Sequence, residues 1–241
     1  MIEVPTAPAL HYVGDAAAWL AAFTVGRWQH RRWPQSSRDL AAITAPSYFV
    51  ALGLGALIGA WAIGSATSLA AHPFGLSHSI AGALAGGIVA VELWKWRRGI
   101  TASTGSSFAA PLAVGIAVGR LGCLFAGLAD YTYGTPTALP WAVDLGDGVG
   151  RHPVQLYEAA AMTLFAVVLI RARIAGAAWA ERHAFHALAI VYAAQRFAWE
   201  FLKPYPRLVG PLDAFHFVMV GLIVYGIVWW RRGGPEPHPA P

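Results

Sequence analysis

The chain contains a stretch of fifty-two residues, from Leu40 to Val91, that holds no Asp, Glu, Lys or Arg. A transmembrane helix needs about 20 predominantly apolar residues, so this stretch is long enough for two membrane spans and the turn between them. Polar residues around His72, Pro73 and His78 mark that turn. Only 12% of all residues are charged, whereas soluble domains carry about 25%, so a soluble globular fold is excluded.

Seven apolar runs follow one another, each close to the length that crosses about 30 Å of hydrocarbon. Lipid offers the backbone no hydrogen-bond partners, and the runs are too long for barrel strands, so they must form helices. The sequence therefore predicts an all-α integral membrane protein with a single polytopic membrane domain over residues 1–232 and a disordered tail over 233–241. The expected spans are 10–28, 46–70, 78–96, 107–125, 154–172, 184–203 and 211–230.

The distribution of basic residues predicts the orientation of these spans. If the N-terminus lies outside, the cytoplasmic segments carry twelve Lys and Arg residues and the outer segments carry three. The positive-inside rule then places the C-terminus in the cytoplasm. The longest loop, about 126–152, falls outside, and its many Gly, Pro, Thr, Tyr and Asp residues predict a small folded lobe between the fourth and fifth helices.

Six ionisable residues lie within the predicted spans, where charge is costly and usually functional. The topology places all but one of them in the outer half of the membrane. The exception, Glu92, is expected near the inner face, where it can snorkel or pair with Lys95 or Arg97. The six residues are Asp15, Glu92, Arg120, Glu158, Arg196 and Glu200.

Two of these residues, Arg120 and Arg196, predict a site for an anion. Arg196 and Glu200 are spaced i, i+4 and can form an ion pair on one helix face. Arg120 has no acid on its own helix and needs a partner elsewhere. Two arginines in a low-dielectric site favour an anion, and the guanidinium fork suits a phosphate. A phospholipid head group that enters from the outer leaflet would supply one.

The start of the fifth span carries a polar face. Pro153 occupies a typical first-turn position, and Gln155 and Glu158, at i, i+3, point the same way. Such a face indicates a wet or protein-lined cavity, and a simple capped helix start is the alternative. Glycines in the second and third spans predict close helix packing; they are Gly53, Gly55, Gly59, Gly82, Gly86 and Gly87. The spacing of the nine histidines indicates no metal site.

Five motifs then occur in a fixed order. They are Gly119-Arg120-Leu121-Gly122-Cys123, Tyr133-Gly134-Thr135-Pro136, Pro140-Trp141-Ala142-Val143, His152-Pro153-Val154-Gln155-Leu156-Tyr157-Glu158 and Arg196-Phe197-Ala198-Trp199-Glu200-Phe201. Together with the seven spans, they resemble the prolipoprotein diacylglyceryl transferase family. The resemblance covers about residues 78 to 230.

The resemblance implies an enzyme of the bacterial inner membrane that needs no cofactor. Its substrates would be phosphatidylglycerol and the lipobox cysteine in a prolipoprotein signal peptide, and no nucleic acid would take part. Arg120 matches the family's signature arginine, and Arg196 and Glu200 match its sixth span. The expected catalytic residues are Arg120, Arg196, Glu200, Glu158 and His78. The expected substrate-binding residues are Arg120, Arg196, Tyr157, Gln155, His152, Cys123 and Tyr12.

Several positions depart from the family pattern. Cys123 stands where the family has an asparagine, and Leu128 where it has a glutamate. Ala81 falls at the family's histidine position, while His78, one turn earlier, lies on the same helix face. These departures predict a divergent member whose phospholipid site is retained and whose acceptor chemistry is altered. Four candidates remain for the base that takes the thiol proton: His78, Glu158, Glu200 and Asp130.

Four other functions compete with this prediction. A related enzyme would keep the phospholipid site and use another acceptor, and a non-catalytic lipid-binding protein would keep only the arginines. A transporter or proton-coupled channel is disfavoured because the buried charges gather at one face and do not line a path across the membrane. A retinal protein is excluded because the last span contains no lysine.

Overall fold

The computed structural model describes residues 1–34, 41, 44–71 and 77–232, and about 70% of it is helical. The chain folds into two compact units. The first comprises Met1–Arg32 and Gly105–Pro204, and the second comprises Trp33–Thr104 and Tyr205–Pro241. In chain order the elements are β1 (Ile2–Glu3), α1 (Leu10–Arg32), α3 (Pro46–Ala71), α4 (Ile80–Trp96), η1 (Ser106–Phe108), α5 (Ala109–Ala126), η2 (Gly127–Asp130), β2 (Val143–Asp144), β3 (Gly150–Arg151), α6 (Val154–Ile174), α7 (Ala178–Arg182), α8 (Ala184–Glu200) and α9 (Ala214–Arg231).

Four stretches of the described chain are long and apolar enough to span a membrane. They are Pro46–Ala66, Ser106–Asp130, Val154–Ile174 and Ala214–Arg231. The chain is thus a largely helical membrane protein, as the sequence predicts. Three further helices coincide with expected spans: α4 and α8 have 17 residues each, and α1 is more polar. That seven helices cross the membrane therefore stays a prediction. The predicted tail, 233–241, lies outside the described residues.

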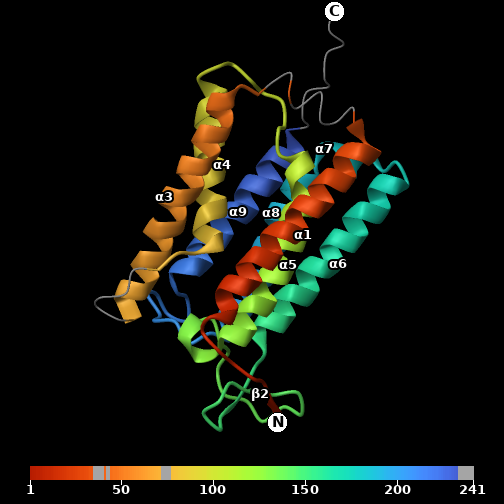
Figure 1. Ribbon diagram of the computed structural model, residues 1–241. Coiled ribbons are helices and arrows are strands. Elements are labelled where there is room, and N and C mark those ends of the chain that lie inside the picture. Colours follow the sequence, from red (N-terminus) through yellow and green to blue (C-terminus); the bar gives the residue numbers. More distant parts are fainter. Residues whose placement is uncertain (35–40, 42–43, 72–76, 233–241) are drawn as a thin grey trace, which may run out of the picture. The chain divides into compact units, whose positions relative to one another are not determined.

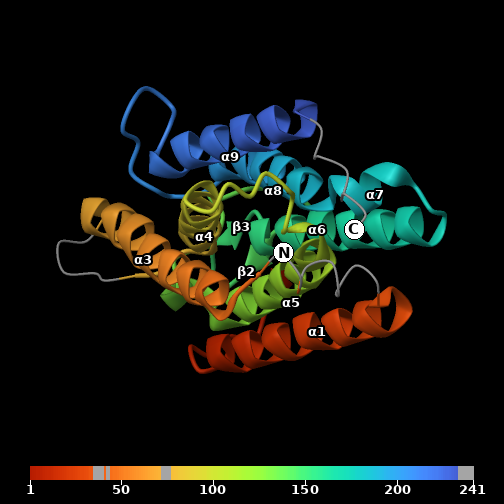
Figure 2. The same ribbon diagram turned by 90° about the horizontal axis from the view of Figure 1, so that it is seen from above.

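The first unit is built around α5, which packs against both α1 and α6 (Figure 1, Figure 2). Gly14 of α1 and Gly122 of α5 allow the closest approach in this group. A Cβ added to Gly14 would lie 2.3 Å from the Cα of Gly122, so neither position has room for a side chain. This contact fixes the start of α1 against the last turns of α5. Helix α8 completes the unit by packing against α6.

A small sheet covers one end of the first unit. Strand β1, near the start of the chain, pairs with β2 in parallel, and β2 pairs with β3 in antiparallel orientation. Strands β2 and β3 lie within the long loop predicted to fold as a lobe. The side chain of Asp144 accepts hydrogen bonds from the backbone N–H groups of Gly146, Asp147 and Gly148, which shapes the turn between β2 and β3. Arg151 donates two hydrogen bonds to Asp147 and thereby lowers the pKa of that carboxyl.

The second unit contains a close glycine contact between α3 and α4. A Cβ added to Gly59 would lie 2.3 Å from the carbonyl oxygen of Gly82, and one added to Gly86 would lie 2.2 Å from the carbonyl oxygen of Gly55. The predicted packing role is confirmed for these four residues. It is wrong for Gly53, because a Cβ there would meet no atom within 4 Å.

The side chain of Glu92, a residue of α4, contacts α9 within the second unit. Lys95 donates to both of its carboxylate oxygens, at 3.0 and 3.2 Å, and the Tyr225 hydroxyl of α9 donates at 3.0 Å. The predicted pairing of Glu92 with Lys95 is therefore confirmed. At the start of α9, the side chain of Asp213 caps the helix, and His216 completes the capping box.

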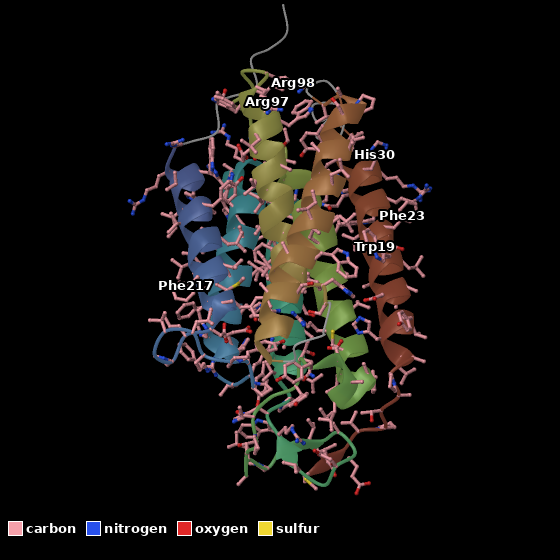
Figure 3. The ribbon with its side chains drawn as sticks, turned by 90° about the vertical axis from the view of Figure 1, so that its left-hand side faces the viewer. Trp19, Phe23, His30, Arg97, Arg98 and Phe217 are labelled. Atoms are coloured by element: carbon pink, nitrogen blue, oxygen red, sulfur yellow. The ribbon has the colours of Figure 1, made fainter. Side chains whose placement is uncertain are left out.

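Large apolar side chains cover the outer faces of helices in each unit. Trp19 and Phe23 point away from α1, and Phe217 points away from α9 (Figure 3). Trp19 is 80% exposed, which would be costly in water and is favourable against lipid chains. The exposed apolar faces thus agree with a protein embedded in a bilayer.

The glycine contact yields a prediction about stability. We expect Gly59→Ala to lower the free energy of unfolding by about 1–3 kcal/mol, because the added methyl group would meet the backbone of α4. Gly53→Ala on the same helix should be neutral or stabilising by up to about 1 kcal/mol, since alanine is the better helix former. Thermal unfolding in detergent would compare the two variants. Equal midpoints would contradict the packing role of Gly59.

Candidate active site

The carboxylate of Glu158, in the second turn of α6, lies between three basic side chains within the first unit. Arg120 of α5 forms an ion pair with Glu158 through its Nε atom. The Nζ atom of Lys203, just after α8, lies 2.5 Å from Oε1 of Glu158. Arg196 of α8 lies 3.7 Å from Oε2 of the same carboxylate. Glu158 therefore joins α5, α6 and α8 at one point.

Glu200 completes this buried charge cluster. It lies 3.3 Å from Nε of Arg196 on the same helix and 3.7 Å from Nζ of Lys203. The predicted ion pair within α8 therefore exists, but Arg196 also reaches Glu158, so this pair does not account for the whole arrangement. The cluster has five members, all at most 3% exposed: Arg120, Glu158, Arg196, Glu200 and Lys203.

The charges of the buried cluster do not balance. Three side chains are cationic and two are carboxylates, which leaves one positive charge in excess. Buried ions lose their hydration, so a site in which cationic side chains outnumber carboxylates favours an anion. The cluster is thus suited to an anionic ligand, and its two guanidinium groups can each donate two parallel hydrogen bonds to phosphate oxygens.

Two further polar groups on the same helix faces point to a ligand. Gln155 lies one turn before Glu158 on α6 and is 1% exposed, and Tyr192 lies one turn before Arg196 on α8 and is fully buried. Neither the amide of Gln155 nor the hydroxyl of Tyr192 has a hydrogen-bond partner in the part of the chain that the structure describes. Buried polar groups are rarely left without one. A polar ligand in this place would satisfy both.

Aromatic residues flank the cluster where the lobe meets α6. The indole N–H of Trp141 donates to the hydroxyl of Tyr157 at 2.8 Å. The ring of Tyr157 lies 5.1 Å from that of Trp199 and 6.4 Å from that of His152. Two of the expected substrate-binding residues, Tyr157 and His152, therefore lie together beside the cluster but form none of its ion pairs.

A second group of polar side chains lies where α1 begins and α5 ends. The Nδ1 atom of His11 is 2.9 Å from Oδ1 of Asp130, and its Nε2 atom is 3.4 Å from Asp15. Cys123 belongs to the same group, and one guanidinium nitrogen of Arg120 lies 3.9 Å from its sulfur. Cys123 is thus one helical turn from the buried charge cluster.

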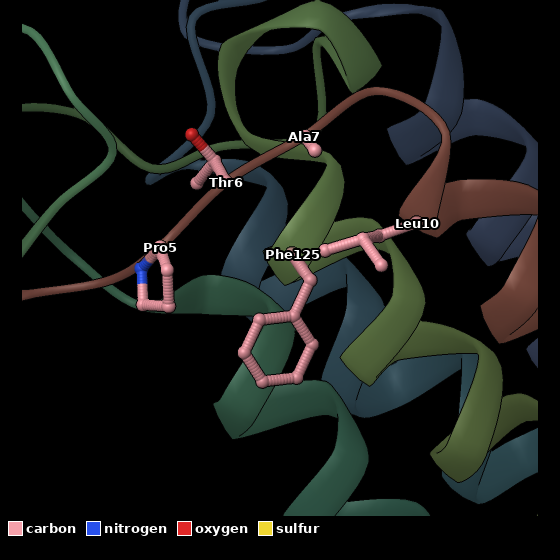
Figure 4. A pocket seen from close by; sticks show the side chains of 5 residues that line it. All are labelled: Pro5, Thr6, Ala7, Leu10 and Phe125. Carbon is pink, nitrogen blue, oxygen red and sulfur yellow. The ribbon is translucent and has the colours of Figure 1, made fainter.

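An open, mostly apolar pocket lies beside this second group (Figure 4). Leu10, which precedes His11, and Phe125, two residues after Cys123, form one side of it. The backbone N–H of Ala7 donates to the carbonyl oxygen of Phe125 at 2.9 Å and holds the chain before α1 against the end of α5. The lining residues are Pro5, Thr6, Ala7, Leu10 and Phe125.

The other expected site residues lie elsewhere. Tyr12 is 76% exposed on α1 and forms none of the cluster's ion pairs, which among the described residues join only α5, α6, α8 and the segment after α8. His78 belongs to the second unit, where it is exposed and its ring lies 6.2 Å from that of Trp61. Ala81, at the family's histidine position, is fully buried in the same unit.

Sequence reasoning missed Lys203 as a member of the cluster. The predicted topology places Lys203 among the basic residues of the outer loops, where a lysine is usually hydrated. Its spacing carried a signal, because Arg196, Glu200 and Lys203 follow one another at i, i+4 and i+7 and so continue one helix face. His11 was missed as well, since its partners come from a distant helix and turn.

Comparison with known proteins identifies the family of this chain. A model of the prolipoprotein diacylglyceryl transferase family matches residues 12–232. Three similar proteins are each named phosphatidylglycerol–prolipoprotein diacylglyceryl transferase. The one from Solidesulfovibrio magneticus is 29% identical, covering 95% of this chain and 90% of its own length. The one from Nitratidesulfovibrio vulgaris is 35% identical over 67% of this chain and 63% of its own length.

The third relative, from Bordetella parapertussis, is 43% identical, but that match spans only 33% of this chain and 31% of the relative. The family match is far longer and includes every member of the buried charge cluster. The chain belongs to the prolipoprotein diacylglyceryl transferase family.

Proposed function

We propose that this protein transfers the diacylglyceryl group of phosphatidylglycerol to the thiol of a lipobox cysteine in prolipoproteins. The observation that carries the proposal is the buried cluster of three cations and two carboxylates, with Gln155 and Tyr192 beside it. The family match and the names of the relatives support the same reaction. The site residues named below are part of the proposal.

Arg120 and Arg196 bind the phosphodiester and stabilise the charge that develops on it. In the transfer, the acceptor sulfur forms a bond to the terminal glycerol carbon of the diacylglyceryl group. The bond between that carbon and the phosphate oxygen breaks, and the oxygen keeps the bonding electrons. Glycerol phosphate leaves, and the thiol proton is released. Guanidinium groups fixed in a dry site favour this step because they need little reorganisation as the charge forms.

Glu158 acts as a positioning residue in this account. It holds Arg120, Arg196 and Lys203 around one point before the lipid arrives. Three cations would otherwise repel one another in a low-dielectric site. Gln155 then supplies its buried amide to the head group, and Tyr192 supplies its hydroxyl.

The proposed location is the bacterial inner membrane, crossed seven times, with the N-terminus and the sheet-bearing lobe in the periplasm. The count of twelve basic residues against three supports this orientation. The buried charge cluster then lies in the half of the membrane next to the outer leaflet, where both the phospholipid and a translocated signal peptide are present.

The departures at Cys123 and Leu128 favour a second candidate with the same phospholipid site and a different acceptor. A non-catalytic lipid-binding protein would share the donor site as well. The experiment that separates these three functions supplies labelled phosphatidylglycerol with a lipobox peptide or with other thiol and hydroxyl acceptors. The acceptor that becomes labelled distinguishes the first two functions. Lipid binding without any labelled product identifies the non-catalytic lipid-binding protein.

The proposed reaction predicts that the two arginines act together. We expect an Arg120→Ala, Arg196→Ala double variant to lose at least roughly 100-fold in kcat for transfer from labelled phosphatidylglycerol to a lipobox peptide. Arg171→Ala, an exposed arginine at the other end of α6, is the matched control and should keep wild-type activity. Transfer that persists in the double variant would contradict the assigned role of the two arginines in phosphate binding.

The buried amide of Gln155 predicts opposite effects on stability and binding. Gln155→Leu removes a polar group that lacks a partner among the described residues, so we expect the lipid-free protein to unfold at the same or a higher temperature. The same change should raise the KM for phosphatidylglycerol about tenfold, because the amide no longer meets the head group.

Gln29→Leu is the control for this effect. Gln29 of α1 is also buried with both side-chain polar atoms lacking a partner among the described residues. Its replacement should likewise preserve stability but leave the KM unchanged. If Gln155→Leu and Gln29→Leu behave alike in the kinetic measurement, Gln155 is not part of the lipid site.

A further inference from the structure

His11, Cys123 and Asp130 form a group of metal-binding side chains that the proposed phosphate chemistry does not use. One ligand atom from each lies within 4.8 Å of the other two. His11 comes from the first turn of α1, Cys123 from the last turn of α5 and Asp130 from η2. The fold thus brings together a nitrogen, a sulfur and an oxygen ligand from three different elements.

We propose that His11, Cys123 and Asp130 bind a single Zn²⁺ ion and leave its fourth position open for the thiol of the acceptor. The second half of this proposal rests on the proposed function. Imidazole, thiolate and carboxylate are the ligands that zinc prefers, and sites with three protein ligands keep a fourth position for a reacting group. Ligand atoms on a tetrahedral zinc are roughly 3.2–3.8 Å apart. The 2.9 Å between His11 and Asp130 would therefore lengthen by about 0.5 Å, and a pair at the 4.8 Å limit would shorten by about 1 Å.

Neighbouring side chains orient His11 and Asp130 as metal sites require. When Nδ1 of His11 faces the metal and Asp130, its Nε2 atom is directed to Asp15, at 3.4 Å. A carboxylate on the second nitrogen of a metal-bound histidine fixes the tautomer and raises the basicity of the ring. The hydroxyl of Thr132 donates to the second oxygen of Asp130 and leaves Oδ1 for the metal.

The charges of the ligands themselves match a dication, with the guanidinium of Arg120 3.9 Å from the sulfur of Cys123. A thiolate from Cys123 and the carboxylate of Asp130 together neutralise Zn²⁺, so the occupied site carries no net charge. The site lies at the C-terminal end of α5, where the free carbonyl groups give the helix dipole its negative end. Cys123 is 7% exposed and the side chain of His11 is 23% exposed, so an ion can reach the group.

The position of the site gives the metal a part in the transfer. Cys123 lies one turn from Arg120, and the apolar pocket that includes Leu10 and Phe125 is beside it. A thiol that binds zinc loses its proton and becomes a nucleophile at neutral pH. The proton passes to solvent, the sulfur bonds to the glycerol carbon, and the phosphate oxygen leaves with the electron pair of the broken bond.

Metal binding can be measured without any turnover. Protein stripped with a chelator is loaded with Zn²⁺ or Co²⁺, and we expect about one metal ion per chain. The Co²⁺ form should show a sulfur-to-metal charge-transfer band that is lost in Cys123→Ser. His11→Gln should lower the metal affinity at least tenfold, and Asp15→Asn about 10–100-fold through the orientation of His11.

His30→Gln, an exposed histidine on the same helix, is the matched control and should bind metal as the wild type does (Figure 3). The metal-free variants should still bind phosphatidylglycerol, which shows that they are folded. Wild-type protein that takes up no metal, or a Cys123→Ser variant with an unchanged cobalt spectrum, would overturn the site.

The fourth position is tested with lipobox peptides that contain either cysteine or serine. The cysteine peptide should shift the cobalt spectrum, and the serine peptide should not. Chelation should abolish transfer and Zn²⁺ should restore it. Transfer that is indifferent to chelation overturns the role in thiol activation and leaves the proposed function intact. Metal and thiol binding without transfer would contradict the proposed function and leave the site intact.

Discussion

The ion pairs of Glu158 hold the functional end of the first unit together. A single carboxylate accepts Arg120 from α5, Lys203 from the segment after α8 and, at longer range, Arg196 of α8. Removing one partner from a buried ion pair typically costs about 3–5 kcal/mol, because the other charge is left without compensation. Glu158 therefore determines both how α5, α6 and α8 meet and where the guanidinium groups are presented.

The remaining architecture allows these charges to be buried. Glycines at the contact between α1 and α5 let the start of α1 approach the end of α5 closely. Apolar side chains such as Trp19 and Phe23 face outward, so the helices can sit in lipid while their polar faces turn inward. The sheet and its turn, organised by Asp144, close the same end of the unit. A hydrophobic exterior and a charged interior thus meet the conditions for holding a phospholipid head group.

The sequence predicted the helices and most of the charge cluster, because both follow from the free-energy cost of placing unpaired backbone groups or charges in lipid. Long runs without charge must be helices in lipid, and Arg120, Glu158, Arg196 and Glu200 were expensive exceptions within those runs. The expectation that Arg120 needs an acid from another helix is confirmed by Glu158.

What the sequence could not provide depends on contacts between distant segments. The sequence predicts that Lys203 is a loop residue, because basic side chains near a span end usually reach water. The neighbourhood of His11, Cys123 and Asp130 was not predicted, because it arises only when α1 packs against α5 and the chain turns at η2. The expected role of Tyr12 rests on a local sequence match, and in the structure its side chain is 76% exposed.

The central claim is that the guanidinium groups of Arg120 and Arg196 contact the phosphate of the donor lipid. Solid-state NMR on protein with ¹⁵N-labelled arginine, reconstituted with phosphatidylglycerol, can measure the nitrogen–phosphorus distance directly. We predict a distance of about 4 Å, as a charge-assisted hydrogen bond requires, and its loss in the Arg120→Lys, Arg196→Lys double variant. A wild-type spectrum without dipolar coupling between arginine nitrogen and phosphorus would contradict the account.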